Sequence, residues 1–71
     1  SEIGMGSKLT VKLGNKELAF EIVGSNEVDP ARGKISNESP LGKAFMGRKK
    51  GDKVEVQAPA GKIKYEILDV K

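Results

Sequence analysis

Two stretches near the beginning of the chain alternate apolar and polar residues. Every second residue is apolar from Lys8 to Leu13, and a similar alternation runs through residues 17–23. A half-buried strand has this period of two, because successive side chains point to opposite faces of a sheet. Gly14 and Asn15 supply a turn between the stretches, so the pattern predicts a β-hairpin whose two strands share one apolar face.

Two further stretches with this alternation lie near the end of the chain. One covers residues 53–57 and the other residues 62–67, and residues 58–61 supply a turn between them. These stretches predict a second hairpin. Leu68 breaks the alternation because it puts an apolar residue at a polar position, so we expect a β-bulge near Ile67-Leu68 or a final stretch covered on both faces.

The segment between the two predicted hairpins begins with a loop. Residues 24–33 are rich in glycine, serine, asparagine, aspartate and proline. These residues favour turns through backbone freedom, a fixed φ or side-chain hydrogen bonds to the main chain. We therefore predict a loop of about ten residues, longer than a usual connection. Residues 34–36 follow it as a brief strand.

A short helix is predicted after this loop. The hydroxyl of Ser39 can cap the first exposed N–H groups, and Pro40 fits the first helical position, where its missing N–H costs nothing. Three apolar residues, the last of them Phe45, then follow the i, i+3, i+4 spacing of one buried helical face. The helix should run from residue 40 to about residue 46 and end at Gly47.

Together these elements predict one α+β domain. We expect an antiparallel sheet of four to five strands with one short helix packed on one face, because short loops join successive strands and no other element can cover the sheet. A chain of 71 residues supplies one core. Residues 1–6 contain two glycines and no sustained pattern, so we predict a linker or lead-in segment there. Ordered structure should begin near Ser7, with a single domain over residues 7–71.

The residue types that the sequence lacks narrow its chemistry. The chain has no cysteine and no histidine, which leaves no thiolate nucleophile, no disulfide and only carboxylates as strong metal ligands. We expect no metal, no other cofactor and no catalytic residue. No apolar run approaches the roughly 20 residues that cross a bilayer, so we expect a soluble, cytoplasmic protein without a membrane partner. We also expect a monomer.

Charge gives only a weak indication of a partner. Thirteen basic and ten acidic residues give a net charge of +3, but both signs are interleaved along most of the chain, as on an ordinary solvated surface. Arg48, Lys49 and Lys50 form a dense basic cluster. They leave open the alternative that the chain is a small nucleic-acid-binding domain, although no interleaved aromatic residues are present for base stacking. Glu27 and Asp29 are better explained as turn residues than as a catalytic pair, because no third ligand or base lies nearby in the sequence.

Several motifs resemble the C-terminal domain of Gre-type bacterial transcript cleavage factors. Residues 35–44 and 47–52 are similar to the family stretch ISxxSPLGxALLGxxxGD, residues 21–29 to IVGxxEAD, and residues 58–67 to TPAGxxxYEI. The likeness covers essentially the whole chain. Two positions depart from it, because Phe45-Met46 replaces two leucines and Gln57-Ala58 precedes Pro59 where a Thr-Pro pair is common.

This resemblance implies both a fold and a function. The fold would be FKBP-like. Gre factors rescue backtracked RNA polymerase by stimulating the polymerase's own cleavage of the transcript, and carboxylates at the tip of a long coiled coil help to hold a metal ion for that cleavage. The present sequence has no heptad pattern, so the resemblance implies a docking domain that is not an enzyme. The implied partner is bacterial RNA polymerase, held through a coiled coil of its largest catalytic subunit at the rim of the secondary channel.

In related factors a short acidic-Ser-Pro stretch takes part in this contact. The matching residues here are Glu38, Ser39 and Pro40, and Leu41 follows them, so these four are the predicted polymerase-binding residues. A structural role explains part of the pattern as well. Ser39 and Pro40 suit a helix start, and the helix dipole favours an acid just before a helix. Glu38 can also pair with an arginine of a partner.

A prolyl isomerase of the FKBP type is the alternative enzyme function. Its active site is an aromatic pocket with a tryptophan floor. The present sequence has no tryptophan, and its aromatic residues are Phe20, Phe45 and Tyr65. Three aromatic residues in a domain of this size are better used in the core, so we expect no isomerase activity.

Overall fold

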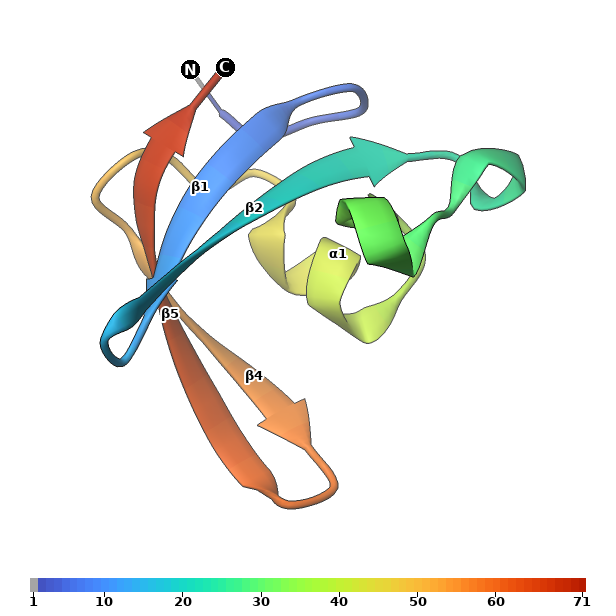
Figure 1. Cartoon of the computed structure of the whole chain (residues 1–71). Helices are drawn as coiled ribbons and strands as arrows, with labels where there is room; N and C mark the ends of the chain where they lie inside the picture. Colours follow the sequence, from blue (N-terminus) through green and yellow to red (C-terminus); the bar gives the residue numbers. More distant parts are fainter. Residues whose placement is uncertain (1) are drawn as a thin grey trace.

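The computed structural model describes residues 2–71 as a curled sheet of five strands with one short α-helix (Figure 1). The strands follow the order β3-β2-β1-β5-β4 across the sheet. The α+β architecture predicted from the sequence is confirmed. The elements are β1 (Lys8–Leu13), β2 (Lys16–Val23), the 3-10 turns η1 (Ser25–Glu27) and η2 (Pro30–Arg32), β3 (Lys34–Ser36), α1 (Pro40–Phe45), β4 (Lys53–Ala58) and β5 (Gly61–Val70).

Two antiparallel hairpins make up most of the sheet, as the alternation predicts. β1 pairs with β2 along its whole length, and β4 pairs with β5. β1 and β5 then pair in the middle of the sheet and join the two hairpins. The helix α1 lies inside the curl of the sheet (Figure 1) and buries Phe45 completely. The helix therefore covers one face of the sheet, in agreement with the prediction.

The brief strand β3 departs from the expected antiparallel pairing. It runs parallel to β2, with Ile35 opposite Ile22. Parallel pairing requires a connection that returns the chain to the starting end of the neighbouring strand. The loop of residues 24–33 makes this return with its two 3-10 turns, and Gly33 closes the second turn in the left-handed conformation at φ 74°. The assumption that successive strands pair antiparallel is wrong here because this loop is long.

The expected β-bulge is present in β5. Thr10 on β1 pairs with Asp69, whereas the next residue, Val11, pairs with Ile67. Leu68 is therefore the extra residue, and the bulge predicted near Ile67-Leu68 is confirmed. The extra residue lets β5 keep one apolar face toward the core although the alternation in the sequence breaks.

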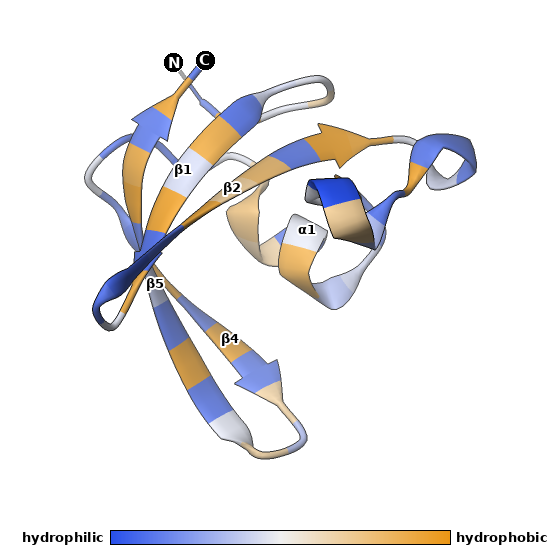
Figure 2. Ribbon diagram, viewed as in Figure 1, coloured by the Kyte–Doolittle hydropathy of each residue, from blue (hydrophilic) through white to orange (hydrophobic). Residues whose placement is uncertain are grey.

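The core lies on the concave side of the sheet and includes a cluster of three aromatic rings. Figure 2 shows the alternation of apolar and polar positions along β1 and β5 that builds this face. Phe20, Phe45 and Tyr65 come from β2, α1 and β5, and their ring centroids lie between 5.4 and 6.4 Å apart. The expectation that the aromatic residues serve the core is confirmed. The buried apolar residues are Ile3, Leu9, Val11, Ile22, Val23, Phe45, Val54, Val56, Tyr65 and Ile67.

Ordered structure begins earlier than the sequence pattern indicates. Ile3 is 2% exposed and belongs to the core. Its N–H donates to the Arg48 carbonyl oxygen (2.8 Å), and its carbonyl oxygen accepts from the Gly47 N–H (2.9 Å). The prediction that order begins near Ser7 is therefore wrong. A single buried isoleucine outside any periodic run gives no signal that a pattern search could detect.

The surface carries few fixed charge contacts. Within residues 2–71 two ion pairs form, Arg32 with Asp29 and Lys62 with Glu55, each at 3.5 Å and well exposed. Exposed pairs of this kind contribute little to stability. In the same part of the chain no helix is long and apolar enough to cross a membrane, and no three His, Cys, Asp or Glu side chains lie together as metal ligands.

Candidate partner-binding groove

Ser39 fixes the start of α1. Its hydroxyl accepts a hydrogen bond from the Gly42 N–H (3.0 Å) and donates one to the Ser36 carbonyl oxygen (2.7 Å). The Ser39 backbone is extended, as an N-cap requires, and its own N–H also donates to the Ser36 carbonyl oxygen (3.1 Å). Pro40 occupies the first helical turn. The predicted cap is therefore confirmed, and it ties the helix start to the end of β3.

Gly42 lets the helix approach β3 closely. The residue is buried, and a Cβ atom built on it would overlap the Ser36 carbonyl oxygen. A glycine inside a helix lowers helix propensity by about 1 kcal/mol relative to alanine. The close approach explains why a glycine is nevertheless found here. The helix start and β3 are consequently packed directly against each other.

The four predicted polymerase-binding residues surround this helix start. Glu38 and Pro40 are exposed, whereas Ser39 and Leu41 are half-buried. The N–H of Glu38 donates to the Ser36 hydroxyl (3.0 Å), which fixes its main chain. Among residues 2–71 no basic side chain forms an ion pair with the Glu38 carboxylate. The corner thus presents an unpaired carboxylate beside an exposed proline ring.

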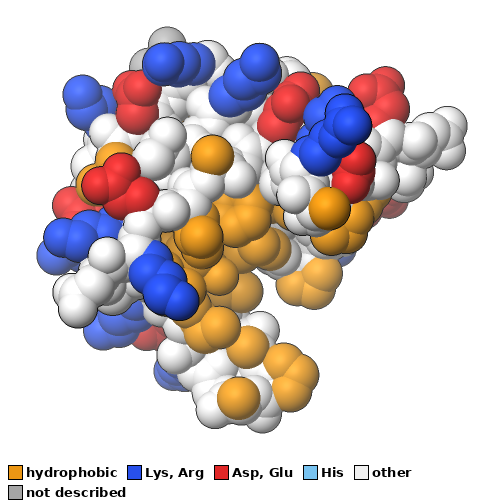
Figure 3. Space-filling view, in the orientation of Figure 1, with side chains coloured by type: hydrophobic (Ala, Val, Ile, Leu, Met, Phe, Trp, Pro, Cys, Tyr) orange, Lys and Arg blue, Asp and Glu red, His pale blue; other side chains and the backbone are white. Residues whose placement is uncertain are grey.

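A groove of about 490 Å³ opens beside this corner (Figure 3). The helix start and β3 line one side, and the tip of the β4–β5 hairpin lines the other. Figure 3 shows apolar side chains gathered in the hollow, with charged side chains around it. All three prolines of the chain line the groove, so parts of both walls have a restricted backbone. The apolar lining includes Ile35, Pro40, Leu41, Val56, Pro59 and Ile63.

Tyr65 is the one aromatic residue among those described that lines the groove. It is 8% exposed, and its ring meets the ring of Phe45 edge to face. Phe20 and Phe45 pack in the aromatic cluster and do not line the groove. An aromatic pocket of the isomerase type therefore does not form, and the alternative function of a prolyl isomerase gains no support from the geometry.

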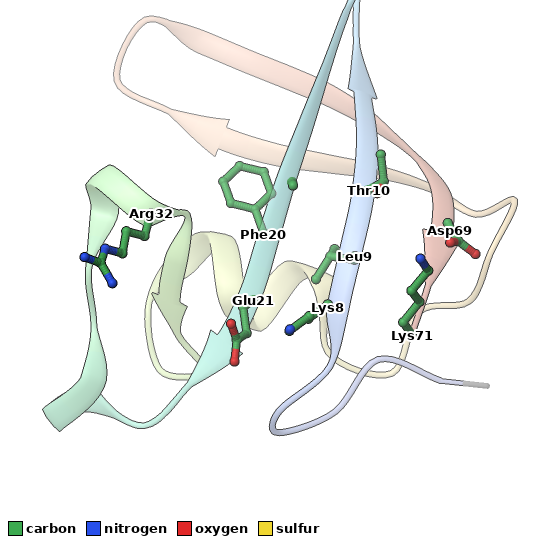
Figure 4. Close-up of a pocket in the computed structure, with 9 residues that line it drawn as sticks. Lys8, Leu9, Thr10, Phe20, Glu21, Arg32, Asp69 and Lys71 are labelled. Carbon is green, nitrogen blue, oxygen red and sulfur yellow. The ribbon is translucent and has the colours of Figure 1, made fainter.

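A second hollow, of about 260 Å³, lies on the outer face of β1 and β2 (Figure 4). Its lining carries both positive and negative side chains, such as Lys8 and Glu21. In Figure 4 the side chains of Arg32 and Asp69 lie at opposite ends of the hollow. The charges are therefore spread out and do not converge on one ligand position, which leaves the apolar groove as the stronger candidate for a binding site.

The family of the chain follows from comparison with known proteins. A family model described as "Transcription elongation factor, GreA/GreB, C-term" matches residues 1–71. The chain belongs to this family. The transcription elongation factor GreA of Clostridium acetobutylicum is 51% identical over 71 residues, and that of Clostridium botulinum (strain Eklund 17B) is 52% identical. Each match covers 97% of the present chain but only 45% and 44% of the relative, so this GreA/GreB domain spans about half the length of those proteins.

Solved structures of GreA/GreB relatives have the same fold. The crystal structure of GreA factor homolog 1 from Thermus thermophilus matches with a TM-score of 0.87 and 28% identity, over 100% of this chain and 49% of that one. The GreA/GreB factor from Nitrosomonas europaea matches with a TM-score of 0.82 and 28% identity, over 97% of this chain and 59% of that one. The resemblance stated from the motifs is therefore confirmed in family and in fold.

The structure brings the predicted site residues together and adds a wall that the sequence did not reveal. Ser39, Pro40 and Leu41 line the groove, and Glu38 lies directly before them. The opposite wall, at the β4–β5 tip, was not predicted. Its apolar residues alternate like those of any half-buried strand, so the sequence assigns them to the core. The exposed Pro59 in the turn is the one signal in the sequence that could have drawn attention to this tip.

Proposed function

We propose that this domain docks a transcription elongation factor on bacterial RNA polymerase through the Glu38–Leu41 corner and the adjoining groove. Membership in the GreA/GreB family supports polymerase as the partner. The observation that carries the proposal is the unpaired Glu38 carboxylate on a corner fixed by Ser39, at the edge of an open apolar groove. A charged group next to a preorganised apolar surface suits specific recognition of a protein.

The finer identity of the partner rests on the resemblance to Gre factors. It points to a coiled coil of the largest catalytic subunit, at the rim of the secondary channel. An amphipathic helix from such a coil can place apolar side chains in the groove while a basic residue pairs with Glu38. Because hydrogen bonds from Ser39 to the Ser36 carbonyl oxygen fix the corner, little backbone order is lost there on binding.

The proposal gives this domain no catalytic role. The resemblance assigns the stimulation of transcript cleavage to coiled-coil carboxylates, and this domain would place them by holding the polymerase rim. We propose that the longer factor rescues backtracked complexes in this way. The domain alone should bind weakly, because the two contacts of a longer factor reinforce each other through effective concentration.

The basic cluster of Arg48, Lys49 and Lys50 is the main feature that favours nucleic acid as a partner instead. All three residues are exposed. They lie beyond the C-terminal end of α1 and do not line the groove. Nucleic-acid contact is therefore a secondary candidate, and strong weakening of DNA or RNA binding by added salt would be its sign.

A charge reversal tests the docking proposal. The domain is titrated with a polymerase fragment that carries the rim coiled coil, and binding is measured by calorimetry. Glu38→Lys should weaken binding about tenfold, since it replaces attraction by repulsion, and the melting temperature should stay within a few degrees. Glu17→Lys makes the same charge change at an exposed position of β2, away from the groove, and should leave affinity within about twofold. Equal binding by Glu38→Lys and the unchanged domain would place the docking surface elsewhere.

A further inference from the structure

The outer edge of β4 leaves main-chain groups without partners. Within residues 2–71 β4 pairs with β5 alone, and Ala58 opposite Gly61 closes a two-residue turn. In such a hairpin the closing pair is hydrogen-bonded, and bonded pairs then recur at every second residue. Val56 and Val54 consequently bond to β5. The N–H and C=O groups of Glu55 and Gln57 point away from β5, toward the free edge.

The other end of the hairpin supports this assignment. The Ile67 N–H donates to the Asp52 carbonyl oxygen (2.8 Å), and the Ile67 carbonyl oxygen accepts from the Gly51 N–H (2.7 Å). Ile67 therefore directs both main-chain groups toward the β4 side. Counting back by two places Tyr65 and Ile63 in the same orientation, which agrees with the count from the turn.

The two edges of the sheet differ in this respect. At the β3 edge, Lys34 exchanges two hydrogen bonds with Asp29, both of 3.0 Å, and the Ser36 carbonyl oxygen accepts bonds from Ser39. At the β4 edge no hydrogen bond from outside the hairpin reaches Glu55 or Gln57 within residues 2–71. Both residues are exposed. The β4 edge is therefore open.

This open edge runs along the apolar groove. Gln57 lines the groove together with its neighbours Val56 and Ala58. Toward the hairpin tip, β1 pairs with β5 only as far as Lys12↔Glu66. The rest of the β4–β5 hairpin is therefore a two-stranded arm. A two-stranded ribbon is only marginally stable by itself, and a third strand adds to its stability.

We propose that the β4 edge binds an extended peptide segment of a partner protein as an added strand, with alternate apolar side chains in the groove. Unpaired main-chain donors and acceptors at strand spacing are matched by an extended chain, whereas the main-chain groups of a helix are already bonded to one another. The proposal goes beyond polymerase docking because it gives the groove a second class of ligand. The charged side chain of Glu55 is on the outer face, so it flanks the added strand and does not fill the groove.

The pairing geometry predicts which amides of the peptide matter. We place the added strand antiparallel to β4. In an antiparallel pair, residues directly opposite each other share a face, and only the hydrogen-bonded pairs exchange main-chain bonds. The side chains of Glu55 and Gln57 lie on the outer face, and their main-chain N–H and C=O groups point toward the free edge. A peptide residue that bonds to them therefore has its side chain on the outer face, and the residues between have their side chains in the groove.

A capped octapeptide of sequence Lys-Thr-Val-Thr-Val-Thr-Val-Lys serves as the probe, with binding followed by NMR titration of the labelled domain. The amide signals of Glu55 and Gln57 should shift together with those of the groove. The same peptide N-methylated at its threonines should bind at least fivefold more weakly, because those amides face β4. The matched peptide N-methylated at its valines should bind within about twofold of the parent.

Two variants of one residue test the protein side. Gln57→Pro removes the edge-directed N–H without removing a bond to β5, and proline is tolerated at such edge positions. It should weaken peptide binding at least fivefold, whereas Gln57→Ala should stay within about twofold. Glu17→Lys, a charge reversal on β2 away from the groove, should leave peptide binding within about twofold. Absence of probe binding, or equal binding by the two methylated peptides, would overturn the proposal whether or not Gln57→Pro folds.

Discussion

The two walls of the groove are held in different ways. On one wall, the Ser36 carbonyl oxygen accepts two bonds from Ser39, and Gly42 allows the helix to sit directly against β3. On the other wall, Val56 and Ile63 belong to a hairpin tip that no third strand of the described part of the chain supports. The first wall has a single geometry that is fixed from several sides. The second wall depends on one ladder of hydrogen bonds, on the buried Val56 and on side chains such as Ile63 that are only half-buried.

This difference assigns different tasks to the two walls. A fixed wall suits recognition of a partner with a definite shape, because its residues are already in place before binding. A weakly supported arm adapts more easily and gains stability when something binds to it. The proposed polymerase contact uses the fixed corner, and the proposed strand addition uses the arm. Changes made separately to the two walls can therefore distinguish the two functions.

The largest effect is expected from Phe45→Ala. Phe45 is fully buried, and its ring contacts those of Phe20 and Tyr65. Removing it should lower the free energy of unfolding by about 3–5 kcal/mol, because a cavity forms where α1 meets the sheet. Chemical denaturation measures this loss. A decrease below about 1 kcal/mol would mean that α1 does not anchor the fixed wall to the core.

A smaller effect on the fixed wall is expected from Ser39→Ala. The change removes the cap on the Gly42 N–H and the bond to the Ser36 carbonyl oxygen. It should lower the free energy of unfolding by about 1 kcal/mol. Polymerase binding should fall with it, because the orientation of Glu38 depends on the same corner. Ser25→Ala, at an exposed serine with no side-chain hydrogen bond among residues 2–71, is the control and should change neither quantity.

The helix start in the fixed wall and the bulge in β5 could be predicted from the sequence because their signals are local. A serine and a proline in succession specify a helix start, and the break of alternation at Leu68 specifies the bulge. Such signals involve residues a few positions apart. Ile3 gave no comparable signal, since its burial depends on main-chain bonds with residues 47 and 48, far along the chain.

The groove itself could not be predicted for a related reason. Ile63 alternates with polar residues just as the buried residues of β1 do, although it is only half-buried. Whether such a residue meets a packed core or an open groove depends on how far the neighbouring strand extends. β1 ends at Leu13 and leaves the tip of β5 paired with β4 alone within the described residues. How far β1 extends along β5 depends on residues far apart in the sequence. The alternation within one strand therefore does not reveal it.

The smallest effect on stability is expected from Ile63→Thr, on the arm. Ile63 and Ile67 lie on β5 with their side chains on the same face, but Ile67 is 1% exposed in the centre of the sheet and Ile63 is only half-buried. Ile63→Thr should cost less than about 1 kcal/mol, whereas Ile67→Thr should cost about 2–3 kcal/mol through a buried polar group. The octapeptide should nevertheless bind the Ile63 variant several-fold more weakly, because the apolar lining of the groove is reduced. Denaturation and NMR titration of the Ile63 variant measure both quantities, and an equal stability loss at the two positions would show that the arm is held as firmly as the centre of the sheet.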